Sequence, residues 1–554
     1  MNRMRIYIAH NEDTLRTIAQ KFTISVDDLL ACNPTIEHPD LNVAGRQVRF
    51  PSSSLQQAIP SCDVTDILNP GEYLDHWIPL TPIEEMAQKD YDVIIVGTGA
   101  GGSAVLWRLC EQWQKSGKRI AVVEAGDLFL PTHAQNIPTL NGNRRDRFFR
   151  NRKFWKPVPT ANANIMGDLS LLPSAPHYFE EFIALGGRGM IWGNAVPEMH
   201  PVDIAKWPVS LKEMTRYYTI AKQVMNVSSD YGKDSSLTEV ILNRLVNNGF
   251  PEAVPLPLAV DLQPTKYGYI HSNVFFSSMD FFAWALSFGS FDLAVKARAI
   301  KVRTEKNKAV GVEVMTRDKK TYHLRGKTVV LSTSTFETPR ILLSSGIPGK
   351  AIGHYLTTHS RIDSQAAFET TDFPEILGTA DVLVPRTAER DYQIQIGYSH
   401  YLYELKPIRN NVLVWFGASG LVESRYENYV ALNRENIDEY GVPRLEVHFS
   451  YSVKDEKLLH KMTEGVKQAA GAAQGVITSL CSLPPGLVYH EMGTCRMGTD
   501  PETSVTNPYG RVHGVQGLYI ADNSVIPTSG AANPTLTTIA LAIRTADYLM
   551  KQFQ

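Results

Sequence analysis

Residues 91–127 read YDVIIVGTGAGGSAVLWRLCEQWQKSGKRIAVVEAGD, and this stretch decides the fold. Two short apolar runs, 93–96 and 120–123, enclose a glycine-rich turn and a segment of helical character. Continuous apolar runs are typical of parallel strands that are buried on both faces of a sheet. The stretch therefore predicts a strand, a turn, a helix and a second strand, which together form one unit of an α/β fold.

The turn has the spacing of a dinucleotide-binding site, Gly97-x-Gly99-x-x-Gly102. The first glycine permits the tight turn, the second lets the backbone approach a pyrophosphate, and the third lets helix and strand pack closely. The pyrophosphate would lie at the positive helix N-terminus. Glu124 ends the second strand 22 residues after Gly102 and can accept hydrogen bonds from ribose hydroxyls. The motif predicts a bound dinucleotide and does not separate FAD from NAD.

Four further motifs follow along the chain. One is the glycine-rich stretch ALGGRGMIWGNA (184–195), whose backbone can run close to a flat group such as a flavin ring or to crowded neighbouring chain. Another is KTVVLSTSTFETPRILLSSGI (327–347), which predicts a strand followed by a helix. VYHEMGTCRMG (488–498) contains His490, and GAANPTLTT (530–538) contains Asn533 at the start of the last predicted helix. On these residues alone, His490 could be a catalytic base, a metal ligand or a polar residue in a turn.

Residues 91–554 resemble the glucose–methanol–choline (GMC) oxidoreductases, which bind FAD. The motifs above occur in the order of that family, followed by GRVHGVQGLYIADNSVIPTSGAANPTLTTIALA at 510–542. The segment YGVPRLEVHFSYSVKDEKLL (440–459) most resembles the branch of the pyranose oxidases and the large subunits of gluconate and fructose dehydrogenases. The resemblance implies a Rossmann-like FAD-binding domain and a substrate domain with an antiparallel sheet. The FAD-binding domain would comprise 91–205, 290–348 and 486–554, and the substrate domain 206–289 and 349–485.

The resemblance also assigns the site residues. It makes His490 the general base and Asn533 its partner in front of flavin N5, and it implies no metal. The residues implied to contact the cofactor are Gly97, Gly99, Ala100, Gly101, Gly102, Glu124, Ala125, Gly187, Arg188, Gly189, Trp192, Gly193, Asn194, Val295, Asp522, Asn533 and Thr535.

Two residues depart from the family pattern. In pyranose oxidases a histidine of the glycine loop bonds covalently to the flavin, and Ile191 stands at that position here. We therefore expect FAD to be held noncovalently. Ser334 replaces a glycine of the family's AAGA turn, which puts the geometry of that loop in question.

The resemblance implies oxidation of a CH–OH group to a carbonyl, with hydride transfer to the flavin and reoxidation by O2 or another acceptor. The substrate would be a sugar, a polyol, an amino sugar or a related hydroxylated metabolite. Two alternatives remain. Some family members bind FAD and act as lyases without net redox change, and the N-terminal unit could make the chain mainly a glycan-binding protein.

Residues 6–51 form that unit, and their patterns predict the order β-α-α-β. EDTLRTIAQKF, ISVDDLLACNP and AGRQVRFP resemble a LysM module, which implies glycan binding by the loops near 10–14 and 36–43. A retained packing or assembly module is the alternative. We assign 1–53 to this module and 54–90 to a linker.

Composition limits the partners. A chain of 554 residues suggests two or three domains, and the net charge of −2 without a long basic run argues against nucleic acid. Five cysteines without a CxxC pair indicate neither a zinc site nor a disulfide framework. We find no transmembrane stretch and no apolar run of signal-peptide length, so the expected location is the cytoplasm.

Overall fold

The structure is a computed structural model in which the chain forms two compact units, Met1–Trp77 and Ile78–Gln554. Residues 78–90, which we assigned to the linker, therefore lie in the second unit, and residues 54–76 of that linker are outside the described ranges. The structure describes residues 6–10, 12–51, 77–137, 154–160, 179–263, 274–373, 378–398 and 411–553.

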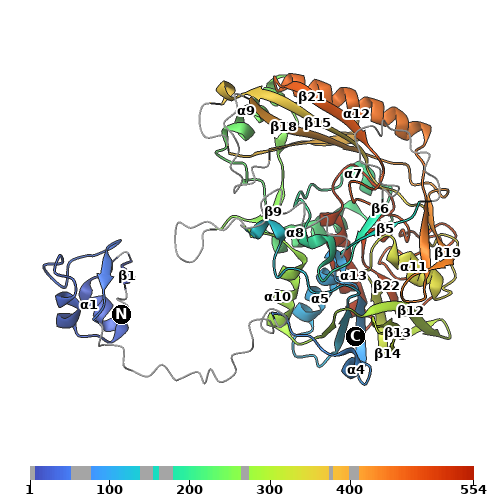
Figure 1. Ribbon diagram of the computed structural model, residues 1–554, viewed down its shortest axis with the longest axis horizontal. Coiled ribbons are helices and arrows are strands. Elements are labelled where there is room, and N and C mark those ends of the chain that lie inside the picture. Colours follow the sequence, from blue (N-terminus) through green and yellow to red (C-terminus); the bar gives the residue numbers. More distant parts are fainter. Residues whose placement is uncertain are drawn as a thin grey trace. The chain divides into compact units, whose positions relative to one another are not determined.

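The N-terminal unit has the predicted order of elements (Figure 1). It consists of β1 (Ile6–Ile8), α1 (Leu15–Phe22), α2 (Val26–Ala31) and β2 (Gln47–Arg49). The two strands pair antiparallel, and the side chains of Thr14 and Ser25 cap the two helices. The unit has a hydrophobic core of its own, whose fully buried members are Leu15, Ile18, Leu29, Val43 and Val48.

The predicted strand–turn–helix–strand unit lies at the centre of a seven-stranded sheet. Its strands run in the order β11-β4-β3-β14-β13-β12, and β22 also pairs with β14. Strands β11, β4, β3, β14 and β22 are parallel, whereas β12 and β13 form an antiparallel extension. The bounds are β3 (Asp90–Val96), β4 (Ile120–Val123), β11 (Asp292–Ala294), β12 (Arg298–Glu305), β13 (Lys308–Met315), β14 (Thr321–Leu331) and β22 (Leu518–Ile520).

Helices pack around this sheet. The glycine turn opens α5 (Ala100–Gln112), which packs against α13 (Thr535–Lys551) and α10 (Ser278–Phe288), and α13 also packs against α8 (Leu211–Val224). Helices α8 and α10 thus pack with their buried apolar faces against the helices beside this sheet. Both lie in the range 206–289 that we predict to belong to the substrate domain, and all of the predicted domain ranges of this unit stay predictions.

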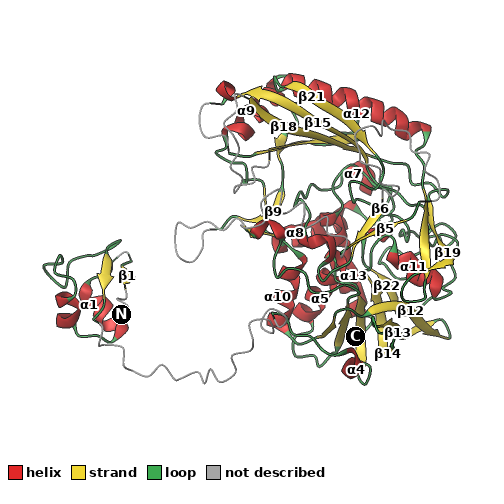
Figure 2. Cartoon of the chain, viewed as in Figure 1, coloured by secondary structure: helices red, strands yellow, loops and turns green. Residues whose placement is uncertain are grey.

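An antiparallel sheet of six strands forms the second layer (Figure 2). Helices α12 (Val453–Ala472) and α9 (Ser236–Asn247) cover one face of it with a shared hydrophobic core. Its order is β21 (Val476–Leu483), β15 (Ser360–Glu369), β18 (Asn411–Gly420), β17 (Tyr392–Tyr398), β16 (Ala380–Val384) and β8 (Val254–Pro255). The sequences at 390–405 and 410–422 predict two neighbouring strands of an antiparallel sheet, and within the described residues β17 does pair antiparallel with β18.

Side chains alternate between the two faces of this sheet. On β17, Ile394 and Ile396 enter the core under the helices, which turns Gln393 and Gln395 to the opposite face. Arg361 and Trp415 lie on that same polar face, with the guanidinium carbon 4.7 Å from the centre of the indole ring. This face of the sheet is therefore lined with polar and aromatic groups.

Shorter elements complete the second unit. The strand pairs are β5 (Trp155–Val158) with β6 (Phe179–Phe182), and β19 (Tyr429–Ile437) with β20 (Pro443–His448). A three-stranded sheet contains β7 (Val227–Ser228), β9 (Leu258–Asp261) and β10 (Val274–Phe275). The short helices are α4 (Ile83–Met86), α7 (Pro201–Ile204) and α11 (Glu337–Ser344).

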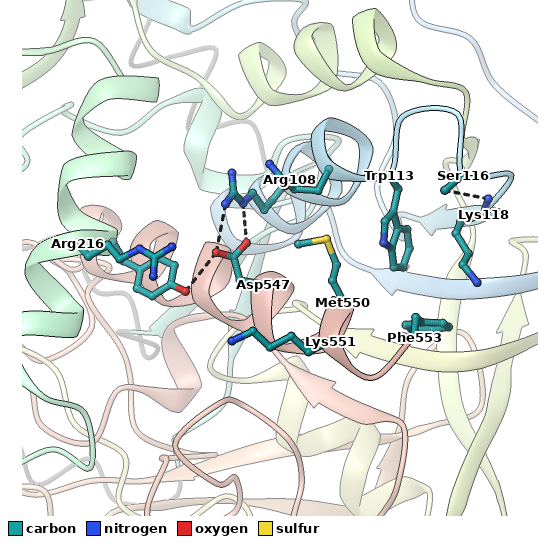
Figure 3. A pocket seen from close by; sticks show the side chains of 11 residues that line it. Arg108, Trp113, Ser116, Lys118, Arg216, Asp547, Met550, Lys551 and Phe553 are labelled. Carbon is teal, nitrogen blue, oxygen red and sulfur yellow. Dashed lines mark hydrogen bonds and ion pairs between the residues drawn. The ribbon is translucent and has the colours of Figure 1, made fainter.

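A pocket of about 470 Å³ opens between the C-terminal ends of α5 and α13 (Figure 3). Asp547 at its centre accepts hydrogen bonds from Arg108 Nε at 2.6 Å and from the Tyr217 hydroxyl at 3.2 Å. Trp113 and Phe553 meet edge to face at one end. The pocket lies at the opposite end of α5 from the glycine turn, and no predicted site residue lines it.

None of the helices in the described ranges is long and apolar enough to cross a membrane. In the same part of the chain, no group of three or more His, Cys, Asp or Glu side chains is placed to hold a metal ion.

Candidate active site

The glycine turn adopts the geometry that a dinucleotide site requires. Gly97 has φ +92°, and a Cβ there would lie 2.3 Å from the carbonyl oxygen of Ser332, so no other residue fits. A Cβ on Gly102 would lie 2.1 Å from the carbonyl oxygen of Gly97, which accounts for the close packing of helix on turn. A Cβ on Gly99, by contrast, would meet nothing within 4 Å. The backbone at Gly99 is thus open on the side from which a pyrophosphate would approach.

Glu124 is held beside this turn. Its Oε2 accepts hydrogen bonds from the Thr98 amide at 3.1 Å and the Thr98 hydroxyl at 2.6 Å, and its Oε1 accepts one from the Gly126 amide at 2.7 Å. Burial raises the pKa of this carboxyl. A carboxylate has about four acceptor positions, so three bonds leave capacity for a ribose hydroxyl. Val295 comes just after β11, which pairs with β4, the strand that ends before Glu124 and Ala125.

The second glycine loop contacts the first. A Cβ on Gly187 would lie 3.2 Å from the Cα of Gly99, and the Gly186 amide donates to the Thr98 hydroxyl at 2.9 Å. Gly189 packs equally closely, since a Cβ there would lie 2.1 Å from Oγ of Ser278. The structure therefore brings together two motifs that are almost ninety residues apart in the sequence.

Arg188 links this loop to the segment that contains His490. Its Nη1 donates to Glu491 Oε2 at 2.6 Å and to the Tyr489 carbonyl at 3.1 Å, and its Nη2 donates to the Glu180 carbonyl. The guanidinium thus holds the residues on both sides of His490. The family resemblance placed Arg188 at the cofactor. In the structure, its guanidinium donates hydrogen bonds to Tyr489 and Glu491, the two neighbours of the predicted base.

Asn194 has a buried side-chain oxygen that could accept a hydrogen bond from a bound cofactor. Its side chain is fully buried, and its Nδ2 donates to the carbonyls of Ala259 at 3.1 Å and Phe276 at 2.9 Å. Its Oδ1 is buried and finds no donor among the described residues. A buried acceptor without a donor is costly, and a donor on a bound cofactor would satisfy it. Nearby, Trp192 Nε1 donates to the Phe276 carbonyl at 3.2 Å, and Gly193 has open space where a Cβ would lie.

Ile191 has no atom that could bond covalently to a flavin. Its side chain packs against the aromatic and apolar cluster of Phe154, Phe182 and Ala184.

Asp522 anchors the C-terminal end of β22. Its Oδ2 accepts from the Ser334 amide at 3.2 Å and the Thr338 hydroxyl at 2.6 Å, and burial raises its pKa. Ser334 has φ +113°, so the turn keeps a glycine-like conformation although serine occupies it. Close by, a Cβ on Gly101 would lie 1.7 Å from the carbonyl oxygen of Ala521, which seats α5, from Ala100 onward, against β22.

His490 lies in the loop between β21 and β22. Met492 exchanges two backbone hydrogen bonds of 2.9 Å with Thr357, which holds the loop beside the start of β15. His490 Nδ1 is 2.8 Å from Nδ1 of His359, and the two rings meet edge to face. Burial lowers the pKa of His490 well below 6.5, and His359, Arg361 and Arg188 lower it further. The imidazole is therefore neutral at neutral pH, as a base must be.

Asn533 immediately precedes α13, which begins at Thr535 after the N-cap Pro534. Its Oδ1 accepts from Gln393 Nε2 at 3.1 Å and from Gln395 Nε2 at 2.5 Å. Both glutamines come from the polar face of the six-stranded sheet. Since its oxygen is occupied twice, Asn533 has its amide hydrogens left to donate to a ligand.

Sequence reasoning missed His359, Gln393 and Gln395. The pattern QIQI at 393–396 alternates with the period of a strand, so it could have indicated that both glutamines share one face. Nothing in THSRID at 358–363 distinguishes His359 from an ordinary polar residue.

Comparison with known families decides the relationship. Two models described as GMC oxidoreductase match residues 183–361 and 424–542, together more than half of the chain. The chain belongs to the GMC oxidoreductases. A model described as LysM domain matches residues 7–51. The predicted family, its α/β fold and the LysM module are thereby confirmed.

Individual relatives of this GMC oxidoreductase agree. The C-glycoside 3-oxidase of Arthrobacter globiformis is 29% identical over 65% of this chain and 73% of its own length. The pyranose 2-oxidase of Tricholoma matsutake is 24% identical over 66% of this chain and 72% of its own length. The solved structure of pyridoxine 4-oxidase from Mesorbium loti superposes with a TM-score of 0.62 at 17% identity, covering 83% of this chain and 99% of that one, which supports the fold alone.

Members of this family bind FAD, and the chain is accordingly an FAD-dependent oxidoreductase. The open backbone at Gly99, the anchored carboxylate of Glu124 and the empty acceptor of Asn194 fit such a cofactor. The individual cofactor contacts and the roles of His490 and Asn533 stay predictions.

Proposed function

We propose that this GMC oxidoreductase oxidises a CH–OH group of a sugar, a polyol, an amino sugar or a related hydroxylated metabolite, with His490 as the general base. One observation carries the proposal. The half-buried His490 is flanked by two residues that Arg188 holds, and Arg188 belongs to the glycine loop that contacts the dinucleotide turn. The base and the predicted flavin loop are thus one connected structure.

Each residue has a distinct task in this proposal. Bound FAD supplies the hydride acceptor. The neutral imidazole of His490 takes the hydroxyl proton, because an alcohol is too weak an acid to lose it unaided. The amide of Asn533, whose oxygen is held by Gln393 and Gln395, donates to the substrate oxygen and orients the C–H bond.

Two observations support a hydroxylated substrate. The names of the relatives, C-glycoside 3-oxidase and pyranose 2-oxidase, refer to sugars. The sheet face that presents Gln393 and Gln395 also presents the stacked pair of Arg361 and Trp415. Amide, guanidinium and aromatic groups on one face suit a molecule with several hydroxyls and apolar C–H surfaces.

A substrate screen tests the proposal. The purified protein is mixed with sugars, polyols, amino sugars and simple alcohols, once with O2 and once anaerobically with an artificial electron acceptor. We expect at least one compound to bleach the flavin absorbance under anaerobic conditions. Turnover of a substrate without bleaching would instead indicate the lyase alternative and contradict the oxidoreductase proposal.

The pH dependence of flavin reduction follows from the environment of His490. Burial, His359, Arg361 and Arg188 all oppose its protonation and lower its pKa well below 6.5. The base is active when deprotonated, so the rate should be flat from neutral pH down past 6.5 and fall only at more acidic pH. Anaerobic stopped-flow reduction across this range is the measurement. A rate of flavin reduction that already falls between pH 7.5 and 6.5 would contradict the lowered pKa of His490 as the base.

We infer that FAD is held noncovalently, since Ile191 replaces the histidine that forms the flavin bond in pyranose oxidases. Precipitation with acid followed by centrifugation should leave the yellow colour in the supernatant. Flavin that stays in the pellet would show a covalent bond through another residue.

We also propose that the LysM unit binds a glycan of N-acetylglucosamine type. It has its own core, so deleting residues 1–53 should leave the flavin content of the remaining chain unchanged while abolishing retention on chitin or peptidoglycan. Absorbance at the flavin band and a pull-down measure the two properties. Equal retention of the full chain and the shortened chain would contradict glycan binding by the LysM unit. Loss of soluble protein on deletion would show that the unit is a structural part of the protein.

A further inference from the structure

A relay of hydrogen bonds leads from a backbone carbonyl to the predicted base. His359 is 1% exposed, and its Nε2 lies 3.1 Å from the carbonyl oxygen of Ser529. Its Nδ1 lies 2.8 Å from Nδ1 of His490. The two imidazoles and the Ser529 carbonyl therefore form a chain of two hydrogen bonds.

The carbonyl fixes the direction of every hydrogen in this chain. A carbonyl oxygen only accepts, so Nε2 of His359 must carry the hydrogen that lies between them. A neutral imidazole has a single N–H, which leaves Nδ1 of His359 as an acceptor. The hydrogen between the two rings then belongs to Nδ1 of His490. The remaining nitrogen of His490, Nε2, has a free lone pair.

We propose that His359 is a positioning residue that holds His490 in the Nδ1–H tautomer, so that Nε2 is the nitrogen that accepts the substrate proton. The inference rests on the proposed role of His490 as the base. It assigns a task to a buried side chain that no sequence motif singled out, and it names the reacting atom.

The charges around the pair favour two neutral rings over a protonated one. Arg361, two residues along β15, donates to Ser419 and Asp363, and Arg188 donates to Glu491. Burial and Arg361 lower the pKa of His359 to about 4, and burial, His359, Arg361 and Arg188 lower the pKa of His490 well below 6.5. With both rings neutral, the count of hydrogens above holds throughout the neutral pH range.

The relay also explains why a histidine suits this position. A carboxylate at the same place would accept the same hydrogen and fix the same tautomer, but its charge would raise the pKa of His490. A neutral acceptor orients the base and leaves it unprotonated. When Nε2 takes a proton, His359 and the Ser529 carbonyl can share the resulting charge through the two hydrogen bonds.

Two variants separate the relay from a packing role. His359→Leu removes the acceptor, so His490 is free to adopt the Nε2–H tautomer. His359→Asn places an amide oxygen near the position of Nδ1 and keeps an acceptor. His460→Leu, an exposed histidine on α12, is the matched control. The FAD-loaded protein is used throughout.

The first readout is ¹⁵N NMR of histidine-labelled protein, in which the His490 signals are identified by their loss in His490→Ala. We expect Nδ1 of His490 to be the protonated nitrogen in the wild type, in His359→Asn and in the control, and Nε2 to become protonated in His359→Leu. The second readout is anaerobic flavin reduction. We expect a fall of roughly 10–100-fold in His359→Leu, as for other residues that orient a reacting group, and recovery of most of that loss in His359→Asn.

A protonated Nδ1 of His490 in His359→Leu, or reduction by that variant within twofold of the wild type, would overturn the proposal. Equal losses in the Leu and Asn variants would do the same, because they indicate packing. If no compound reduces the flavin of any form, the proposed function fails, and the NMR spectra alone still decide this inference.

Discussion

His490→Ala is expected to retain FAD and to slow reduction of the flavin by roughly 10²–10⁴-fold, the range for loss of a general base. The variant removes the imidazole that would take the hydroxyl proton and leaves Arg188 with its partners Tyr489 and Glu491. The main-chain pairing of Met492 with Thr357 is also kept, so the loop should stay in place.

Anaerobic stopped-flow reduction with the best substrate from the screen is the measurement, and the flavin content of each preparation is the control. Asn533→Ala should slow reduction less, because it removes an orienting hydrogen bond and no proton acceptor. Reduction of His490→Ala at the wild-type rate would show that another group is the base.

Glu124→Ala should yield protein that loses FAD readily. The substitution removes the predicted ribose contact, and a lost hydrogen bond to a charged acceptor costs about 1.5–3 kcal/mol, or a roughly 10–100-fold weaker affinity. It also leaves the amides of Thr98 and Gly126 without their acceptor, so the glycine turn itself should loosen.

Glu124→Gln separates these two effects. It keeps one side-chain oxygen and nearly the same volume, so it should retain more FAD than the alanine variant and less than the wild type. The flavin released on gel filtration measures the loss of FAD affinity. The melting temperature of each apoprotein measures the loosening of the glycine turn. Full retention of FAD by the alanine variant would place the ribose elsewhere.

Local patterns predicted the parts of this molecule that local physics decides. The strands at 93–96 and 120–123 followed from continuous apolar runs, and the glycine turn followed from its spacing. The pairing of β17 with β18 followed from alternation, and the β-α-α-β order of the LysM module followed from the patterns of residues 6–51. In each case the residues that determine the element are neighbours in the sequence.

The contacts that hold His490 in place could not be predicted in this way. His359 meets His490 across more than a hundred residues, and Arg188 reaches Tyr489 across three hundred. Such pairs depend on how two sheets and two loops pack together, and the hydrophobic periodicity of a sequence does not predict that packing. The placement of α8 and α10 on the nucleotide-binding side is a further example, because an apolar helix face does not specify its partner.

The position of β22 has a consequence for how the enzyme is made. This strand completes the parallel sheet beside β14, the carbonyl of Ala521 seats Gly101, and α13 packs along α5. All three come from the last part of the described chain, after the whole antiparallel sheet. Because a ribosome delivers the N-terminal part first, the glycine turn lacks these neighbours until residues 518–551 have been synthesised. Nascent chains stalled before β22 should therefore capture no flavin, and cofactor loading should follow the synthesis of β22 and α13.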